Sequence, residues 1–173
     1  VVVSDDGLQH LGLYRDVEIV VVDGQRRWGN GFCLPAGPLR EPIARCRTVD
    51  FIVVNGGEAQ RGEIPMTLIP GALVPLEGGE PLALDRLWVN LEGKVIHAVA
   101  GIGNPQRFFD TLRGFLSRAC VTVGAFVPHI FPDHHPFTPE DIAFPPDKFI
   151  IMTEKDAVKC RLFANKQCWY LPV

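Results

Sequence analysis

The chain has 173 residues, of which 47% are hydrophobic, and a net charge of −3, which is the composition of a folded protein rather than a disordered one. A slightly acidic chain is not expected to be a general nucleic-acid binder. No apolar run reaches the roughly 20 residues of a membrane-spanning helix, and no basic leader precedes an apolar core as in a signal peptide. The cysteines are widely spaced without a C-x-x-C pair, which predicts free thiols in a reducing compartment and neither zinc nor disulfides.

The N-terminal third predicts a parallel sheet that is covered on both faces. Its strands correspond to continuous apolar runs at residues 1–4, 18–22 and 51–54. A Pro/Gly-rich loop, LPAGPLREP at 34–42, and a short helix at 42–47 lie between the last two strands. This order of strand, crossover and strand is the βαβ pattern of an α/β fold.

The rest of the chain predicts a linker and a second α/β unit. Four prolines within residues 61–93 exclude a long helix there, so we expect short strands or a hairpin. From residue 94 the pattern becomes regular, and Asn104 with Pro105 marks the start of an amphipathic helix. The remaining predicted elements are strands at 95–100, 121–127, 149–152 and 169–171 and short helices that start at Thr138 and Thr153.

Two adjacent carboxylates, Asp5 and Asp6, follow the first predicted strand. An acid at the carboxyl end of a buried strand is how many phosphate-transferring enzymes hold Mg²⁺ beside a nucleotide. Gly7 permits a tight turn, and Gln9 and His10 add polar groups on the same side of the crevice. From the residues alone, the alternative is an acid that only caps a loop.

FPDHHPF, at residues 131–137, places Asp133, His134 and His135 on a loop after a strand. Such a loop delivers an imidazole to a reacting centre, with a carboxylate beside it to orient or charge it. A metal site would need a third ligand, and adjacent histidines seldom both reach one metal. The other alternative is a solvent-exposed histidine pair without a chemical role.

Five arginines and a single acid lie between residues 24 and 47. Guanidinium groups match the oxygens of a phosphate or an anionic lipid headgroup, although a solvated basic loop has the same composition. Within this segment Arg40 is the candidate to grip a phosphate, and Glu41 to hold a sugar hydroxyl or an arginine. The chain contains no G-x-x-x-x-G-K-[ST] loop, the usual companion of a strand-end Asp.

Two further segments give weaker signals. GIGNP at 101–105 is similar to a phosphate-binding turn at a helix N-terminus but lacks the third glycine of the dinucleotide fingerprint, and close packing explains its glycines equally well. MTEKDAVK at 152–159 is typical of an ordinary capped helix start.

Taken together, five motifs occur in a specific order: DDGLQH, VDGQRRWGNGFCLPAGPLREP, AGIGNPQRFF, FPDHHPF and TEKDAVK. In this combination the chain closely resembles the tetraacyldisaccharide 4'-kinases, the lipid A kinases of Gram-negative bacteria. The resemblance covers essentially all 173 residues and corresponds to the C-terminal half of such an enzyme. It implies transfer of the ATP γ-phosphate, with Mg²⁺, to the 4'-hydroxyl of a tetraacyldisaccharide 1-phosphate at the cytoplasmic face of the inner membrane.

The resemblance also implies a fold and a domain plan. The fold would be α/β, with part of a P-loop NTPase-like sheet and a smaller second α/β domain. Residues 1–60 would be the remainder of the nucleotide-binding domain, 61–93 a strand or hairpin linker, and 94–173 the smaller C-terminal domain. The chain is therefore expected to be truncated and inactive alone, with the phosphate loop and the membrane-associating region lying upstream.

The family's site residues map onto this sequence motif by motif. Asp5 and Asp6 would serve Mg²⁺ and the phosphates, with Gln9 and His10 completing that motif. Arg40 and Glu41 would lie near phosphate and sugar. Asp133 and His134 match the family's D-H motif, whose histidine pairs with an upstream acid to activate the 4'-hydroxyl, and His135 is the less favoured neighbour.

Two functions of other classes remain open at this point. A non-catalytic α/β module that binds a nucleotide or sugar phosphate would keep the arginines and the strand-end acids and would need no phosphate loop. A His/Asp metallohydrolase would require bound zinc or manganese.

Overall fold

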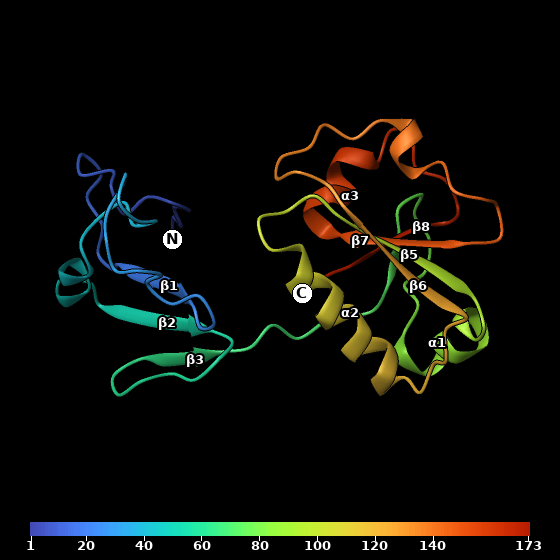
Figure 1. Cartoon of the computed structure of the whole chain (residues 1–173), viewed down its shortest axis with the longest axis horizontal. Coiled ribbons are helices and arrows are strands. Elements are labelled where there is room, and N and C mark those ends of the chain that lie inside the picture. Colours follow the sequence, from blue (N-terminus) through green and yellow to red (C-terminus); the bar gives the residue numbers. More distant parts are fainter. The chain divides into compact units, whose positions relative to one another are not determined.

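A computed structural model describes the backbone of residues 1–173 and the side chains at every position except 84 and 88. The chain divides into two compact units, Val1–Leu68 and Ile69–Val173, and each is described by itself. In Figure 1 the first unit runs from blue to green and the second from green to red.

The first unit is built on a three-stranded parallel sheet in the order β1-β2-β3. Its strands are β1 (Ile19–Asp23), β2 (Phe51–Asn55) and β3 (Ile64–Met66), and the 3-10 helix η1 (Ile43–Arg47) precedes β2. The strands predicted at 18–22 and 51–54 and the short helix before the second of them are confirmed.

Two predictions for the first unit are wrong within the described residues. Residues 1–4 form no strand, and Val1, Val2 and Val3 are all exposed, because an apolar run forms a strand only where a neighbouring strand pairs with it. The sheet is also not covered on both faces, since Val21 keeps 61% of its surface exposed while Val22 beside it is buried. Asp5 and Asp6 consequently lie in a turn and not at a strand tip.

The second unit is a five-stranded sheet in the order β4-β8-β7-β5-β6. Parallel pairing joins β5 through β8, and β4 is antiparallel to β8 at the edge. The strands are β4 (Val74–Pro75), β5 (Val95–Ala100), β6 (Ala125–Ile130), β7 (Phe149–Thr153) and β8 (Cys168–Leu171). The strand predicted at 121–127 therefore begins four residues later than expected.

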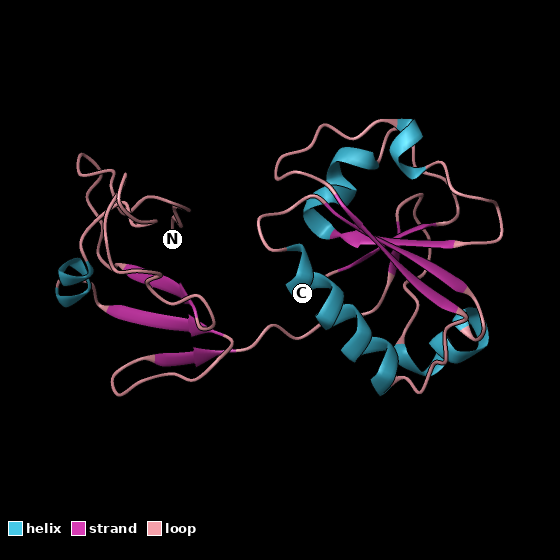
Figure 2. Cartoon of the chain, viewed as in Figure 1, coloured by secondary structure: helices cyan, strands magenta, loops and turns pink.

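Helices cover both faces of this sheet, as Figure 2 shows. Two helices, α1 (Leu84–Leu91) and α2 (Pro105–Arg118), pack with Ile96, Ala98 and Ile151 into one core cluster. On the other face, α3 (Glu154–Cys160) and the 3-10 helix η2 (Pro139–Ile142) pack against Val99, Ile150 and Met152. Successive residues of a strand alternate between the faces, so both cores are built from the same strands.

The start of α2 agrees with its sequence signals. The Asn104 side chain accepts a hydrogen bond from the backbone N–H of Arg107, and Pro105 occupies the first helical position. The apolar face predicted from the helical spacing is buried: Phe108, Phe109, Leu112, Phe115 and Leu116.

Residues 61–93 contribute elements to both units. They form β3 in the first unit and β4 and α1 in the second, and the division falls between Leu68 and Ile69. The short strands agree with the prediction, whereas α1 does not. The prolines exclude only a long helix, and α1 is eight residues long and begins after the last of them. Among the described helices, none has the length and apolar character needed to cross a membrane.

Candidate functional site

The first group of candidate residues lies in the first unit, where an ion pair joins two loops. Arg40 donates from Nη1 to both carboxylate oxygens of Asp6, at 2.8 Å each, across 34 residues of sequence. Hydrogen bonding to Asp6 raises the pKa of Arg40. Both side chains are well exposed, so the pair presents a carboxylate and a guanidinium to solvent at the same place.

The loop that carries Arg40 is closed by its own backbone. Leu34 donates to the carbonyl of Leu39, and Leu39 donates to the carbonyl of Phe32. Residue 37 must be a glycine here, because a Cβ would collide with the carbonyl oxygen of Phe32. These contacts fix the direction in which the chain leaves the loop, and therefore the position of Arg40.

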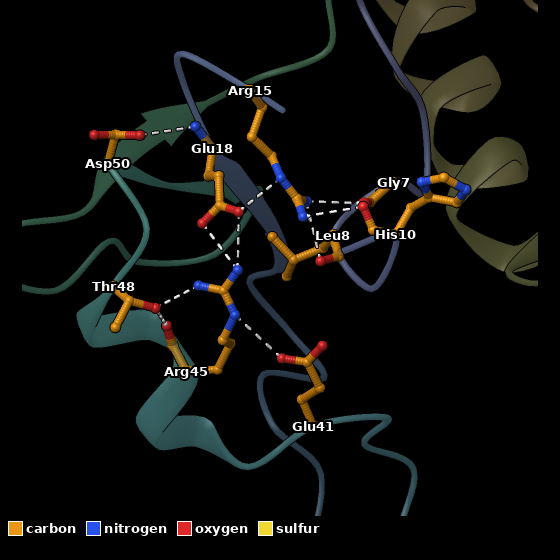
Figure 3. Close-up of polar contacts among 9 residues, drawn as sticks. All are labelled: Gly7, Leu8, His10, Arg15, Glu18, Glu41, Arg45, Thr48 and Asp50. Atoms are coloured by element: carbon orange, nitrogen blue, oxygen red, sulfur yellow. Dashed lines mark hydrogen bonds and ion pairs between the residues drawn. The ribbon is translucent and has the colours of Figure 1, made fainter. Parts of the chain in front are cut away.

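An arginine that the sequence analysis did not single out holds the DDGLQH loop. Arg15 donates from Nη1 to the carbonyls of Gly7 (2.9 Å) and Leu8 (3.1 Å) and from Nη2 to that of His10 (3.2 Å), as Figure 3 shows. The side chains of Gln9 and His10 remain exposed. The backbone of this motif is thus fixed while its polar side chains face solvent.

Arg15 also belongs to a chain of ion pairs that reaches the loop carrying Arg40 (Figure 3). Its Nε lies 3.1 Å from Glu18, whose two oxygens each accept from Nη2 of Arg45 at 2.9 Å. Arg45 in turn lies 3.3 Å from Glu41, the acid next to Arg40. Glu41, predicted to meet a sugar hydroxyl or an arginine, thus contacts an arginine.

The second group lies in the second unit, on the loop after β6. Asp133 accepts a hydrogen bond from Lys155 at 3.2 Å, and this contact is the main reason that the pKa of Asp133 is lowered. The His134 imidazole is 77% exposed, with its Nε2 3.8 Å from the Asp133 carboxylate. His134 has a left-handed backbone, φ 61°, and its N–H donates to Asp133.

Lys155 reaches Asp133 from the first turn of α3. The helix is capped by Thr153, whose side chain accepts from the backbone N–H of Asp156. The cap of this helix is the ordinary one that the TEKD run predicts. The signal for Lys155 was its position directly after a parallel strand, where side chains meet at the carboxyl edge of the sheet.

The two adjacent histidines have different environments. His135 is partly buried and its Nε2 lies 3.0 Å from Asp141, which also closes the capping box of η2 with Thr138. Hydrogen bonds, first from the Thr138 backbone and then from His135, lower the pKa of Asp141. His135 therefore supports η2, whereas the imidazole of His134 faces solvent.

The GIGNP turn lies beside this second group. Gly101 donates its N–H to the buried carboxylate of Asp156 at 2.8 Å, and a Cβ on Gly101 would crowd Phe137 at 3.1 Å. A Cβ on Gly103 would lie 3.6 Å from an oxygen of Asp133. Close packing therefore accounts for Gly101, whereas the contact at Gly103 is an ordinary van der Waals distance and does not require a glycine.

Exposed carboxylates in the first group suit a hard divalent cation. Mg²⁺ takes oxygen ligands and usually binds through one or two carboxylates, keeping several waters. Asp5 and Asp6 supply such oxygens at the surface, and both oxygens of Asp6 accept from Arg40 in this structure. Within the described part of the chain, this loop included, no three or more His, Cys, Asp or Glu side chains are grouped so that they could hold a metal ion by themselves.

Comparison with known proteins identifies the family of the whole chain. The family model for the tetraacyldisaccharide-1-P 4'-kinases, LpxK, matches residues 1–173. The chain belongs to this family. It is 51% identical over 175 residues to the tetraacyldisaccharide 4'-kinase of Vibrio vulnificus, with 100% of this chain and 49% of the relative aligned. The corresponding enzyme of Pseudomonas aeruginosa is 49% identical over 173 residues, with 99% and 49% aligned.

A solved structure of the family has the same fold. The crystal structure of LpxK from Aquifex aeolicus, an apo form in complex with ATP, superposes with a TM-score of 0.63 at 25% identity. The match covers 96% of this chain and 50% of that one. The chain thus spans about half the length of the relatives it matches, and its α/β architecture with parallel sheets is that of the family.

Proposed function

We propose that this chain belongs to an ATP-dependent lipid kinase, which transfers the γ-phosphate to the 4'-hydroxyl of tetraacyldisaccharide 1-phosphate. The chain would supply the carboxylates that hold Mg²⁺ and the histidine that serves the acceptor hydroxyl. The observation that carries the proposal is the exposed His134 beside a carboxylate, Asp133, whose pKa is lowered, in a chain that matches the kinase family from end to end. An exposed imidazole next to a stable negative charge suits general-base catalysis.

The first unit would deal with the nucleotide phosphates. Arg40 would neutralise phosphate charge, and its present partner Asp6 shows that the guanidinium already faces an anionic group. Gln9 and His10, exposed on the held loop, would contact phosphate or the nucleotide, and Glu41 the sugar. Asp5 and Asp6 would hold Mg²⁺, which when bound neutralises charge on the transferring phosphate.

The second unit would deal with the acceptor. His134 would take the proton of the 4'-hydroxyl at its imidazole as the hydroxyl oxygen bonds to the γ-phosphorus. The bond between that phosphorus and the bridging oxygen of the β-phosphate would break, and ADP would leave with that oxygen. Asp133 would stabilise the imidazolium that forms, and Lys155 would keep Asp133 ionised by its hydrogen bond at 3.2 Å. His135, held by Asp141, would position the loop.

The remaining features of the proposal concern the whole protein. Its nucleotide-binding domain would be P-loop NTPase-like and include residues 1–60, joined through 61–93 to the smaller domain at 94–173. The enzyme would work at the cytoplasmic face of the bacterial inner membrane, with the lipid A disaccharide precursor and ATP as partners. The family match and the ATP complex of the Aquifex aeolicus relative support this assignment.

The test is a transfer assay with the complete gene product that carries residues 1–173. The protein is incubated with Mg²⁺, γ-labelled ATP and tetraacyldisaccharide 1-phosphate, and label is sought on the 4'-position of the lipid. We expect labelled lipid that disappears when Mg²⁺ is chelated. Nucleotide binding without label on the lipid would contradict the kinase and favour a non-catalytic binding module.

A further inference from the structure

Arg15 is the centre of the contacts that hold the DDGLQH loop. All three nitrogens of its guanidinium are used: Nε on Glu18, Nη1 on the carbonyls of Gly7 and Leu8, and Nη2 on that of His10. The carbonyl of Gly7 also accepts from the backbone N–H of His10, at 3.0 Å. One side chain therefore closes the turn that directly follows Asp5 and Asp6.

Glu18 ties this arginine to the sheet. The backbone N–H of Glu18 donates to the Asp50 carboxylate at 2.8 Å, and its carbonyl accepts from Asp50 (3.0 Å) and Phe51 (3.2 Å). Glu18 therefore lies where β1 and β2 begin to pair, at the start of the parallel sheet. With only 22% of the Arg15 side chain and 16% of the Glu18 side chain exposed, the pair is shielded enough to hold a defined geometry.

A second arginine links the same glutamate to the other predicted substrate loop. Arg45 contacts both oxygens of Glu18 and also Glu41, and Glu41 adjoins Arg40. The DDGLQH loop and the loop carrying Arg40 are thus fixed to each other through one shared carboxylate, in addition to the exposed pair between Arg40 and Asp6. Loosening this link would let the two loops move independently.

We propose that Arg15 is a positioning residue of the kinase: it fixes the backbone at Gly7–His10 so that Asp5, Asp6, Gln9 and His10 face the phosphates in one arrangement. This proposal rests on the proposed function. The role depends on the fork shape of the guanidinium, because a lysine ammonium carries the same charge but cannot reach Glu18 and three carbonyls at once.

The test uses the complete gene product with three variants, Arg15→Ala, Arg15→Lys and, as a matched control, Arg27→Ala. Arg27 also makes a two-nitrogen pair with a carboxylate, Glu63, in the same unit, and its side chain is likewise 22% exposed. Replacing it therefore removes an equivalent ion pair away from the loop. Thermal unfolding is measured for every variant, which separates a general loss of stability from an effect on the loop.

Two readouts are combined, hydrogen exchange of the backbone amides at residues 9–13 and steady-state kinetics at varied Mg²⁺. For Arg15→Ala we expect faster exchange in this segment, a kcat lowered by about tenfold or more, and a higher Mg²⁺ concentration at half-maximal rate, with KM for the lipid unchanged. Arg15→Lys should restore little of this. Arg27→Ala should lower the melting temperature without faster exchange at residues 9–13.

Several outcomes would overturn the proposal. Unchanged exchange at residues 9–13 in Arg15→Ala would show that the arginine does not hold the loop. Faster exchange together with unchanged kinetics in Arg15→Ala would show that the reaction does not need a fixed loop. Full rescue by Arg15→Lys would show that Arg15 acts through its positive charge and not through the shape of the guanidinium. If the parent protein labels no lipid, the proposed function itself is contradicted, and the exchange data alone then report on the loop.

Discussion

At the scale of single residues, the surroundings of a side chain distinguish groups that the sequence presents as equals. His134 and His135 are neighbours, yet His135 is paired with Asp141 while His134 is exposed beside Asp133. Only the family resemblance favours His134 over His135 in the sequence, because spacing alone does not separate adjacent residues. In the structure they are separated by η2, because Asp141, the acid that caps this helix, contacts the imidazole of His135 and not that of His134.

Removing the lysine beside Asp133 should change how this acid titrates. The hydrogen bond from Lys155 is the main cause that lowers the pKa of Asp133, so Lys155→Ala should raise that pKa toward the ordinary value of an aspartate. Carbon-13 NMR titration of the Asp133 carboxyl measures this directly. Lys148→Ala, which removes a lysine paired with Asp147, is the control. An Asp133 pKa that does not move in Lys155→Ala would contradict the assignment.

A second histidine pair should make the second unit sensitive to acid. His97 Nδ1 lies 2.8 Å from His129 Nε2, Phe144 stacks on His97, and burial lowers the pKa of both histidines, with Lys148 adding to this at His97. Two protonated rings would face each other with N–H groups. The folded state therefore binds these protons less readily than the unfolded chain, so the stability they contribute is complete above the ordinary imidazole pKa of about 6.5 and declines below it.

Urea unfolding checks this dependence on pH. Between about pH 7.5 and about pH 5.5 the unfolding midpoint of the second unit should fall, and the fall should be smaller in a His97→Phe, His129→Phe double variant. Equal pH dependence in parent and double variant would show that other groups, such as the paired carboxylates, are responsible.

At the scale of elements, the sequence predicted those whose signals are local. Asn104 and Thr153 mark helix starts, and the apolar runs at β5 and β7 mark buried strands. What local signals could not provide were contacts between segments: Arg40 with Asp6, Arg15 with three carbonyls, and Lys155 with Asp133. The run at residues 1–4 failed for the same reason, because its strand depends on a neighbour and not on its own composition.

The unexpected helix α1 provides a test of its packing. Leu87 is fully buried in the core cluster with α2, so Leu87→Ala should lower the free energy of unfolding by about 2–5 kcal/mol. Val89, on the same helix but 76% exposed, is the control, and Val89→Ala should stay within about 0.5 kcal/mol of the parent. Chemical denaturation of both variants gives the comparison. Similar effects for the two would mean that α1 does not pack by this face.

At the scale of the whole molecule, the two units differ in how much core they possess. In the described part of the first unit the buried hydrophobic side chains are Val22 and Val54, whereas two clusters fill the second. A unit with few buried contacts opens at low free-energy cost. The predicted site residues in the first unit therefore depend more on polar links, such as Arg15 with Glu18, than on a hydrophobic core.

Hydrogen exchange of the 173-residue chain should reveal this difference. The amides of β5 and β7 should exchange at least about a hundredfold more slowly than those of β1 and β2, since they lie between two packed layers. Mass spectrometry of the peptides that cover each strand measures the rates. Equal protection in both units would show that the first unit is stabilised by contacts that this structure does not contain.

If His134 serves the acceptor hydroxyl in a lipid kinase, the turnover of His134→Ala in the complete gene product should show it. We expect a rate of lipid phosphorylation that is lower by about 100-fold or more, with ATP binding retained. His135→Gln, which keeps a donor for Asp141, should stay close to the parent rate. A near-normal rate in His134→Ala would show that this histidine takes no part in the chemistry.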